Sequence, residues 1–164
     1  MKIKTVKGMN DYLPSDAEIR DYLQSVIIDT YKNSGFEHII TPIVEDAENL
    51  DKSEGGDNLN LIFKVMKRGA KLQKALESGN AKELSDMGLR YDLTVPLSRY
   101  YSNNAAVLSL PFKAMQIGPV WRADRPQKGR FRQFHQCDID IFGDPTNTAE
   151  IELITATSTF LEEA

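Results

Sequence analysis

The stretch that most constrains this fold runs from Val120 to Phe142 and has the pattern of two strands joined by a charged turn. The turn is Pro126-Gln127-Lys128-Gly129, in which proline fixes one backbone dihedral and glycine permits a positive φ. After it, side chains alternate at the strand period. One face carries Arg132, Phe134, Gln136, Asp138, Asp140 and Phe142, and the other carries Phe131, Gln133, His135, Cys137, Ile139 and Ile141. The pattern predicts a hairpin that packs through the second face and binds through the first.

Positive charge gathers at this turn of an acidic chain. The chain has 20 Lys+Arg and 24 Asp+Glu, a net charge of -4. Five basic side chains and one acid, Asp124, nevertheless lie between Arg122 and Arg132. Arginine grips an oxyanion with two parallel hydrogen bonds, so the cluster favours an anion such as phosphate. A solvated loop, kept soluble by its arginines, is the alternative at this point.

The composition is that of a soluble globular domain. The chain has 164 residues, of which 41% are hydrophobic and 27% charged, enough for one domain with a real core. There is no apolar run near 18 residues and no signal-peptide core, which predicts a cytoplasmic protein with no membrane span. The single cysteine, Cys137, excludes an internal disulfide and is expected to be a packed thiol.

The first third of the chain predicts a helix followed by a short strand. Ser15 and Glu18 form a capping-box pattern, and apolar residues then recur at helical spacing to about Ser34, before Gly35. Residues 36–40 have strand character and end at Thr41-Pro42; Ile43 and Val44 could continue the path. The polar segment 45–60 is expected to be a mobile loop with a short helix near residues 47–50.

The middle of the chain alternates strand and helix signals. Residues 61–67 predict a strand, and residues 70–84 predict two short solvated helices with a break at Gly79-Asn80, interpreted as an insertion without chemistry. Residues 88–93 predict the next strand, and Thr94 is a candidate cap for the helix that follows. Residues 112–120 lead into the hairpin, and Asn147 with Glu150 predicts the start of a last helix.

The run WRADRPQKGRFRQFHQCDIDIFG resembles motif 2 of the class II aminoacyl-tRNA synthetases, in the form found in the histidyl-tRNA synthetase family. Helix, glycine, strand and proline over about residues 17–46 resemble motif 1, and motif 2 covers about residues 112–142. The resemblance implies an α+β fold, with an antiparallel sheet containing the hairpin and two long flanking helices. It also implies a homodimer formed through the motif 1 region, although a helix packed on its own sheet gives the same periodicity.

The resemblance implies an ATP-dependent ligase that joins histidine to ATP and moves the histidyl group to tRNA(His). Arg122 matches the catalytic arginine that bridges the α-phosphate and the amino-acid carboxylate. The matching nucleotide contacts are Arg122, Asp124, Arg130 and Phe131. The matching histidine contacts are Asp92, Thr94, Arg122, Gln136 and Asp140. Gln127 and Lys128 match the loop that approaches the tRNA. Mg²⁺ is expected with the ATP, but its ligands cannot be identified in the sequence.

Two of these matches also have a simpler explanation. An acid and a hydroxyl at a strand-to-helix junction, Asp92 and Thr94, suit an ammonium ion but are also typical of a helix N-cap pair. Phe131 stands where many relatives have tyrosine, which keeps the stacking surface and loses a hydroxyl.

The family pattern continues beyond these residues. A third motif and an anticodon-binding domain are absent from residues 1–164, so we expect a truncated catalytic domain, weak or inactive by itself. One alternative is the synthetase-like regulatory subunit of ATP phosphoribosyltransferase, which need not keep both the nucleotide arginine and the tRNA-facing turn. A stand-alone RNA-binding hairpin is a weaker alternative, because aromatic stacking platforms are sparse and the net charge is acidic.

Overall fold

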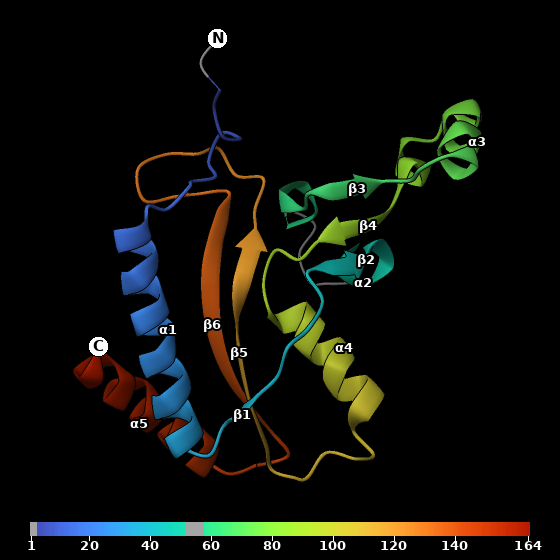
Figure 1. The fold of residues 1–164 in the computed structure, drawn as a ribbon. Helices are drawn as coiled ribbons and strands as arrows, with labels where there is room; N and C mark the ends of the chain where they lie inside the picture. The colour runs from blue at the N-terminus through green and yellow to red at the C-terminus, as the bar shows by residue number, and fades with distance from the viewer. Residues whose placement is uncertain (1–2, 52–57) are drawn as a thin grey trace. The chain divides into compact units, whose positions relative to one another are not determined.

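The computed structural model describes residues 3–51 and 58–164 and has helices and strands in an α+β arrangement (Figure 1). The chain forms two compact units. The first comprises residues 1–9, 41–100 and 119–135, and the second comprises residues 10–40, 101–118 and 136–164. No helix in the described part of the chain is both long and apolar enough to cross a bilayer.

A three-stranded sheet is built on the predicted hairpin. Its order is β1 (Glu37–His38), β5 (Phe112–Trp121), β6 (Gln133–Phe142). Strand β1 pairs with β5 in parallel, with Glu37 opposite Ala114, so this sheet is not purely antiparallel. The predicted strand over residues 36–40 is therefore real but shorter than expected, and residues 43–44 lead into a different sheet.

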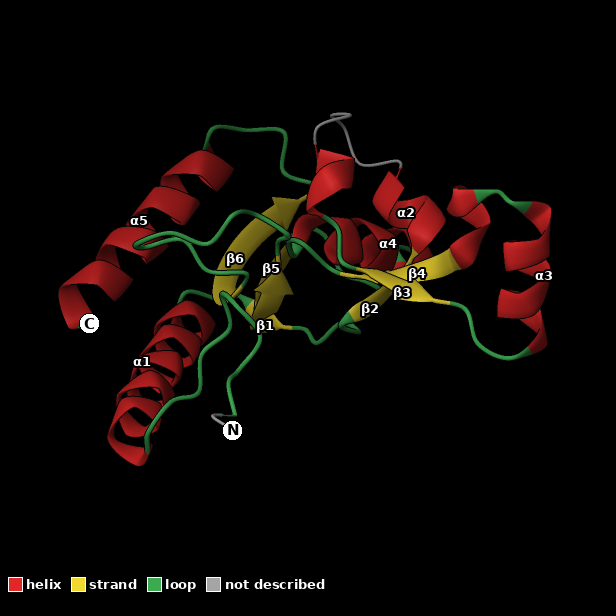
Figure 2. Cartoon of the chain, turned by 90° about the horizontal axis from the view of Figure 1, so that it is seen from above, coloured by secondary structure: helices red, strands yellow, loops and turns green. Residues whose placement is uncertain are grey.

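Two long helices cover one face of the second unit, as predicted. They are α1 (Pro14–Asn33) and α5 (Thr148–Glu163), which lie near one another in both ribbon views (Figures 1 and 2). Their core is built from the fully or largely buried residues Tyr31, Phe36, Met115 and Ala156. Ile139 and Ile141 pack against this cluster, which confirms the apolar face assigned to β6. Burial of such side chains contributes about 1.5–3 kcal/mol each, so this layer anchors the hairpin.

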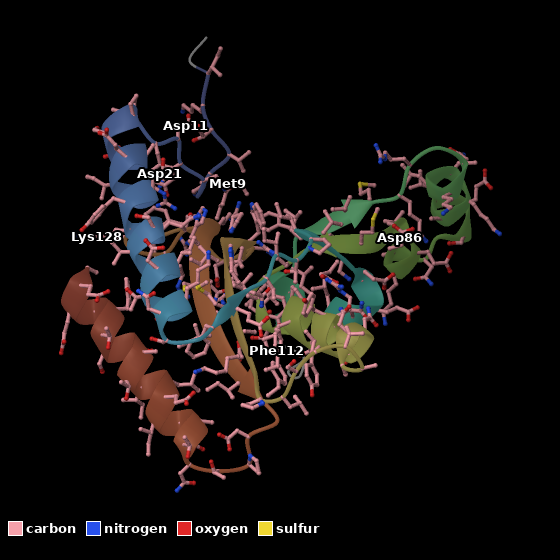
Figure 3. All side chains as sticks on the ribbon, turned by 60° about the horizontal axis from the view of Figure 1, so that its bottom comes forward. Met9, Asp11, Asp21, Asp86, Phe112 and Lys128 are labelled. Atoms are coloured by element: carbon pink, nitrogen blue, oxygen red, sulfur yellow. The ribbon has the colours of Figure 1, made fainter. Side chains whose placement is uncertain are left out.

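The opposite face of β6 carries an aromatic stack at the C-terminal end of the strand. Tyr101, at the end of α4 (Thr94–Asn104), lies with its ring centroid 4.3 Å from that of Phe142 and 6.4 Å from that of Phe112. Phe112, labelled in Figure 3, is only 1% exposed. Offset stacking of this kind stabilises by about 0.5–1.5 kcal/mol beyond area burial. The alternation predicted for β6 is therefore confirmed on both faces near the C-terminal end of the strand.

The first unit contains a second sheet that the sequence did not predict as a sheet. It is antiparallel, in the order β2 (Val44–Asp46), β4 (Ser85–Leu89), β3 (Lys64–Met66). The helical segments of this unit are α2 (Ala47–Asp51), η1 (Asn58–Leu61), α3 (Ala70–Ser78), η2 (Ala81–Leu84) and the first part of α4. Its small apolar cluster consists of Leu50, Ile62 and Tyr91, with Val95 packed against it.

A buried arginine connects three parts of the first unit. Arg90 is 5% exposed, and its Nε donates to the carbonyl oxygen of Pro119 at 3.0 Å. Its Nη1 donates to the carbonyl oxygen of Thr41 at 3.0 Å and to the Thr41 hydroxyl at 3.1 Å. Burial lowers the pKa of the Arg90 guanidinium, with the charge of Glu45 acting in the opposite direction. Glu45 is itself buried and accepts two close hydrogen bonds from Arg99, at 2.7 and 2.9 Å.

Several predicted helix starts are wrong in detail. Helix α1 has Leu13 as its N-cap with no side-chain hydrogen bond, because Pro14 already occupies the first helical position, so the Ser15–Glu18 capping box does not form. The cap predicted at Asn147 also makes no side-chain hydrogen bond. Strand β4 ends at Leu89 rather than continuing to residue 93.

Other local predictions have mixed outcomes. The two short helices predicted over residues 70–84 are confirmed as α3 and η2, with the break at Gly79 in a left-handed conformation. The short helix near residues 47–50 is confirmed as α2. Of the loop predicted over residues 45–60, the first residues belong to β2 and the last to η1, while residues 52–57 lie outside the described residues. Cys137 is exposed, so the prediction of a packed thiol was wrong, although Ile139 and Ile141 on the same face pack against the core.

Candidate functional site

A cavity of about 460 Å³ in the first unit is formed largely by residues of the β5–β6 connection. It is lined by Leu61, Arg122, Asp124, Gly129, Arg130, Phe131 and Phe134. Four of these, Arg122, Asp124, Arg130 and Phe131, are the residues that the sequence analysis assigned to nucleotide binding. The structure therefore brings the whole predicted nucleotide set to one hollow.

The turn at the tip of the connection is held by its own backbone. Gln127 and Arg130 exchange two hydrogen bonds, with N···O distances of 3.2 and 2.9 Å. Gly129 lies between them with a φ of 75°, a conformation that side-chain-bearing residues rarely adopt. The predicted turn is confirmed, and it leaves Gln127 and Lys128 exposed at the tip. They are accessible to a large partner, as the predicted tRNA contact requires.

Arg122 is fixed at three points but keeps its terminal nitrogens free. Its backbone N–H donates to the carbonyl oxygen of Arg132 at 2.9 Å, and its Nε donates to the carbonyl oxygen of Tyr91 at 3.0 Å. Its Cζ lies 5.1 Å from the centroid of the Phe134 ring, within cation–π range. Among the described residues, no partner occupies its two Nη groups. The protein therefore fixes the position of this guanidinium, and its two Nη groups are available to bind an oxyanion.

Asp124 and Arg130 face each other across the cavity. The Arg130 Nη1 lies 3.8 Å from the Asp124 carboxylate, with the Arg130 side chain 59% exposed, so this pair holds loosely. Asp124 is also held through its backbone, since Arg132 Nε donates to its carbonyl oxygen at 3.0 Å. Phe131 is 42% exposed, which leaves a ring face on which a flat ligand can stack.

Gly8 supports the connection, and the sequence analysis did not identify it. The carbonyl oxygen of Gly8 accepts from the N–H of Arg132 at 2.7 Å. Gly8 has a φ of 86°, and a Cβ there would lie 2.8 Å from Pro126 Cγ and 2.9 Å from Arg132 Cγ. Only glycine permits this close approach of the N-terminal segment to the connection. The turn-forming composition of residues 7–14 indicates an irregular segment, but it does not indicate which residues that segment contacts.

Asp92 and Thr94 lie where chain continuity brings them near Arg122, because Tyr91, which accepts from Arg122, precedes Asp92 directly. The Asp92 carboxylate accepts from the backbone N–H of Val95 at 3.3 Å. Asp92 therefore caps α4, and Thr94, which was predicted to cap it, is instead the first helical residue and is exposed. The capping bond occupies one carboxylate oxygen and leaves the other for a ligand.

Gln136 and Asp140 lie on β6 in the second unit and do not line the cavity described above. They are four residues apart on one face, about 13 Å at the strand rise. The Gln136 Oε1 is buried and has no hydrogen-bond donor among the described residues. Burial raises the pKa of the Asp140 carboxyl, and no described side chain pairs with it. Two acceptors in this state suit a ligand that brings its own N–H groups.

The described residues contain no group of three or more His, Cys, Asp or Glu side chains that could hold a metal ion. Mg²⁺ keeps several waters and binds through phosphates with one or two carboxylates, rather than in a full protein cage. The described residues therefore supply no such cage, and we assign no residue to the ion.

Comparison with known proteins gives one family. A family model described as histidyl-tRNA synthetase matches residues 8–164. The chain is 50% identical over 159 residues to the histidine–tRNA ligase of Leifsonia xyli, covering 95% of this chain and 37% of that protein. It is 48% identical over 163 residues to the probable histidine–tRNA ligase of Tropheryma whipplei, covering 99% and 38%. The chain thus spans little more than a third of the length of these relatives.

Solved structures agree with the fold. A histidyl-tRNA synthetase from Nostoc sp. PCC 7120 superposes with a TM-score of 0.78 at 29% identity, covering 99% of this chain and 34% of that one. A Bacillus halodurans protein described as an ATP phosphoribosyltransferase regulatory subunit/histidyl-tRNA synthetase superposes with a TM-score of 0.79 at 21% identity. At that identity the second likeness shows the fold alone.

Proposed function

The chain belongs to the histidyl-tRNA synthetase family, and we propose that it forms the motif 1 and motif 2 part of an active site that activates histidine with ATP. The product would be histidyl-adenylate, which is then passed to tRNA(His). The protein would work in the cytoplasm, as a class II synthetase. The observation that carries the proposal is the cavity in which Arg122, Asp124, Arg130 and Phe131 meet.

The arrangement around Arg122 suits the first chemical step. In that step a carboxylate attacks the α-phosphate and pyrophosphate leaves, so positioning and neutralisation of charge supply most of the rate. Arg122 is held through its Nε and its backbone, so its free fork can contact a phosphate oxygen and a carboxylate oxygen without first being ordered. The role we give it is to hold the two reacting anions together. Mg²⁺, when bound with ATP, would neutralise phosphate charge.

Adenine binding is assigned to the rest of the cavity. The exposed face of Phe131 offers stacking, and Arg130 offers a cation on the same turn. The Asp124 carboxylate, loosely paired with Arg130 at 3.8 Å, is available to accept from the adenine amino group. Each contact is modest by itself, since base–aromatic stacking is worth about 1–3 kcal/mol.

Histidine selectivity is assigned to Gln136 and Asp140. An imidazole carries N–H donors, and both side chains present acceptors that lack a donor in the described structure. A site built on buried acceptors rejects an isostere without the donor, because the acceptors would then stay unpaired. Asp92, beside Arg122 through Tyr91, is the group we assign to the substrate ammonium, with Thr94 beside it.

The exposed tip is assigned to tRNA and the exposed stripe of α1 to a second copy of the chain. Gln127 and Lys128 stand at the turn, where an amide can reach a base edge and an ammonium a phosphate. On α1, Ile19 is 61% exposed and Tyr22 is 58% exposed. A helix that leaves large apolar side chains in solvent fits an interface between copies. Sedimentation equilibrium would show a dimer if this is right and a monomer if it is not.

The regulatory-subunit alternative gains no specific observation. The structural neighbour that bears both names is 21% identical, whereas relatives named histidine–tRNA ligase reach 50%. A regulatory protein also has no need to keep the free fork of Arg122 together with the exposed Gln127–Lys128 tip.

Calorimetric titration with MgATP tests the nucleotide site. We expect binding by the wild-type chain and clear loss on Phe131→Ala, about tenfold or more from the stacking energy. Phe131→Tyr should keep the affinity, because it keeps the ring. The matched control is Arg125→Ala, which removes a cation from the same connection without touching the cavity lining. Equal affinity in Phe131→Ala and wild type would remove the cavity from the proposal.

A further inference from the structure

A second cavity of about 330 Å³ lies in the first unit, in the segment that the sequence analysis had regarded as an insertion without chemistry. It is lined by Lys67, Lys71, Lys74, Ala75, Glu83 and Asp86. The segment extends from the β3–β4 pair and carries α3 and η2 (Figure 1). None of these side chains belongs to the nucleotide cavity.

The segment is basic in an acidic chain. Residues 64–86 hold six Lys and Arg against three Asp and Glu, while the whole chain has a net charge of -4. Lys71 and Lys74 are three residues apart on α3, which places them on one helix face. Lys67 is held near them through its backbone, whose N–H donates to the carbonyl oxygen of Leu84 at 2.9 Å. None of the three ammonium groups forms an ion pair with a carboxylate in the described part of the chain.

The acids at the cavity do not neutralise these lysines. Both oxygens of Glu83 accept hydrogen bonds, from the Ser78 hydroxyl and the Asn80 amide, each at 3.1 Å. Glu83 thus ties the end of α3 to η2. Asp86, labelled in Figure 3 beside this segment, has its Oδ1 buried and without a donor among the described residues. A buried carboxylate oxygen without a donor is costly, and a ligand that supplies one removes the cost.

We infer that this lysine cavity is a contact site for the ribose-phosphate backbone of an RNA. Three ammonium groups attract phosphates, and the Asp86 Oδ1 accepts a hydrogen bond from a ribose 2′-hydroxyl. One polymer carries both groups at a regular spacing, whereas a DNA strand offers no 2′-hydroxyl. The inference rests on the proposed function only for the source of the RNA, a tRNA that the turn at Gln127 also contacts.

The test measures binding of a 20-base-pair RNA duplex, and of the DNA duplex of the same sequence, at several salt concentrations. The cavity variant is Lys71→Gln/Lys74→Gln. Its matched control is Arg68→Gln/Lys82→Gln, which removes the same charge from the same segment outside the cavity lining. We expect the cavity variant to bind RNA at least about fivefold more weakly than the control. The negative slope of log affinity against log salt should become shallower by about 2 in the cavity variant.

A third variant distinguishes the effect of the 2′-hydroxyl contact from the effect of net charge. Asp86→Ala removes an acid and would strengthen binding of any polyanion on charge alone, so we expect DNA binding to rise while RNA binding does not rise in proportion. The ratio of RNA affinity to DNA affinity should therefore be smaller for Asp86→Ala than for the wild type. Equal binding of RNA and DNA by the wild type, or equal loss in the cavity and control variants, would overturn the inference. Because ATP and histidine are absent from this assay, its failure leaves the MgATP test of the proposed function unaffected.

Discussion

The Nε of Arg122 donates a hydrogen bond of 3.0 Å to the carbonyl oxygen of Tyr91. This bond links the first residue of the β5–β6 connection to the segment that precedes α4, which carries Asp92. It fixes the guanidinium at one nitrogen and leaves two nitrogens for ligands. The groups we assign to the substrate carboxylate and ammonium are thus linked by a side chain-to-backbone contact.

Arg122→Lys is expected to weaken MgATP binding by at least about tenfold, although the charge is kept. A lysine ammonium cannot bond Tyr91 and offer a two-pronged grip on a phosphate at the same time. Calorimetry on the folded variant measures this. Arg125→Lys, in the same connection but outside the cavity lining, should bind as the wild type does, and a similar loss in both variants would contradict the assignment.

Arg90→Met is expected to destabilise the fold by about 2–4 kcal/mol, because it removes the hydrogen bonds that the buried guanidinium donates to the carbonyl oxygens of Thr41 and Pro119. Urea unfolding followed by circular dichroism gives the free energy. The exposed Arg68→Met should change it by less than about 0.5 kcal/mol. A cost below about 1 kcal/mol for Arg90→Met would show that water replaces the guanidinium.

Gly8→Ala tests the support of the nucleotide connection by the N-terminal segment. The new Cβ would lie 2.8 Å from Pro126 Cγ, in addition to the strain of a φ of 86°. Gly129→Ala carries a similar φ of 75° but meets no atom within 4 Å, so it isolates the conformational part. We expect Gly8→Ala to lower thermal stability more than Gly129→Ala and to weaken MgATP binding. Equal effects would mean that the contact with Pro126 has no energetic role.

Asp140 and Asp144 are expected to have opposite effects on stability as pH changes. Burial raises the pKa of Asp140, so the folded state holds its proton more tightly and stability is lost as pH rises from its unfolded pKa through its folded pKa. Hydrogen bonds from Thr146 lower the pKa of Asp144, whose contribution is present above its unfolded pKa and lost as pH falls. Asp140→Asn should therefore stabilise the chain at pH 7, and Asp144→Asn should destabilise it there.

Thermal unfolding at pH 7 and at about pH 2.5, below the ordinary aspartate pKa of about 3.9, tests both variants. The differences from wild type should shrink at the lower pH. A loss of stability in Asp140→Asn at pH 7 would show that the carboxylate is paired in solution.

Local sequence patterns predicted the strand alternation within the hairpin. They did not predict contacts between residues that are far apart in the sequence. The alternation along residues 131–142 placed Ile139 and Phe142 on the correct faces, because strand period follows from the backbone alone. The role of Arg90 could not be predicted, since its acceptors on Thr41 and Pro119 are 49 and 29 residues away. The second sheet was missed because its strands are only three to five residues long, too short for a clear periodic pattern in the sequence.

Helix ends failed for a different reason. At α1, proline at the first helical position displaced the expected serine cap, and at α4 the carboxylate of Asp92 took the role predicted for Thr94. Several residues near a helix start have capping chemistry, and the backbone path decides among them. The four residues assigned to nucleotide binding line one cavity, as expected of side chains that lie within ten positions of one another. The contribution of Gly8 required the structure.

Binding of a non-hydrolysable histidyl-adenylate analogue, in which a sulfamoyl group replaces the phosphate, tests the central claim most directly. Its adenosine part is a ligand for the proposed nucleotide cavity, and its histidyl part is a ligand for the proposed histidine groups. We predict that calorimetry will show tighter binding of the histidyl analogue than of the phenylalanyl analogue, whose ring has no N–H, and that Gln136→Leu will reduce the difference. Equal affinity for the two analogues, or no binding of either, would contradict the account.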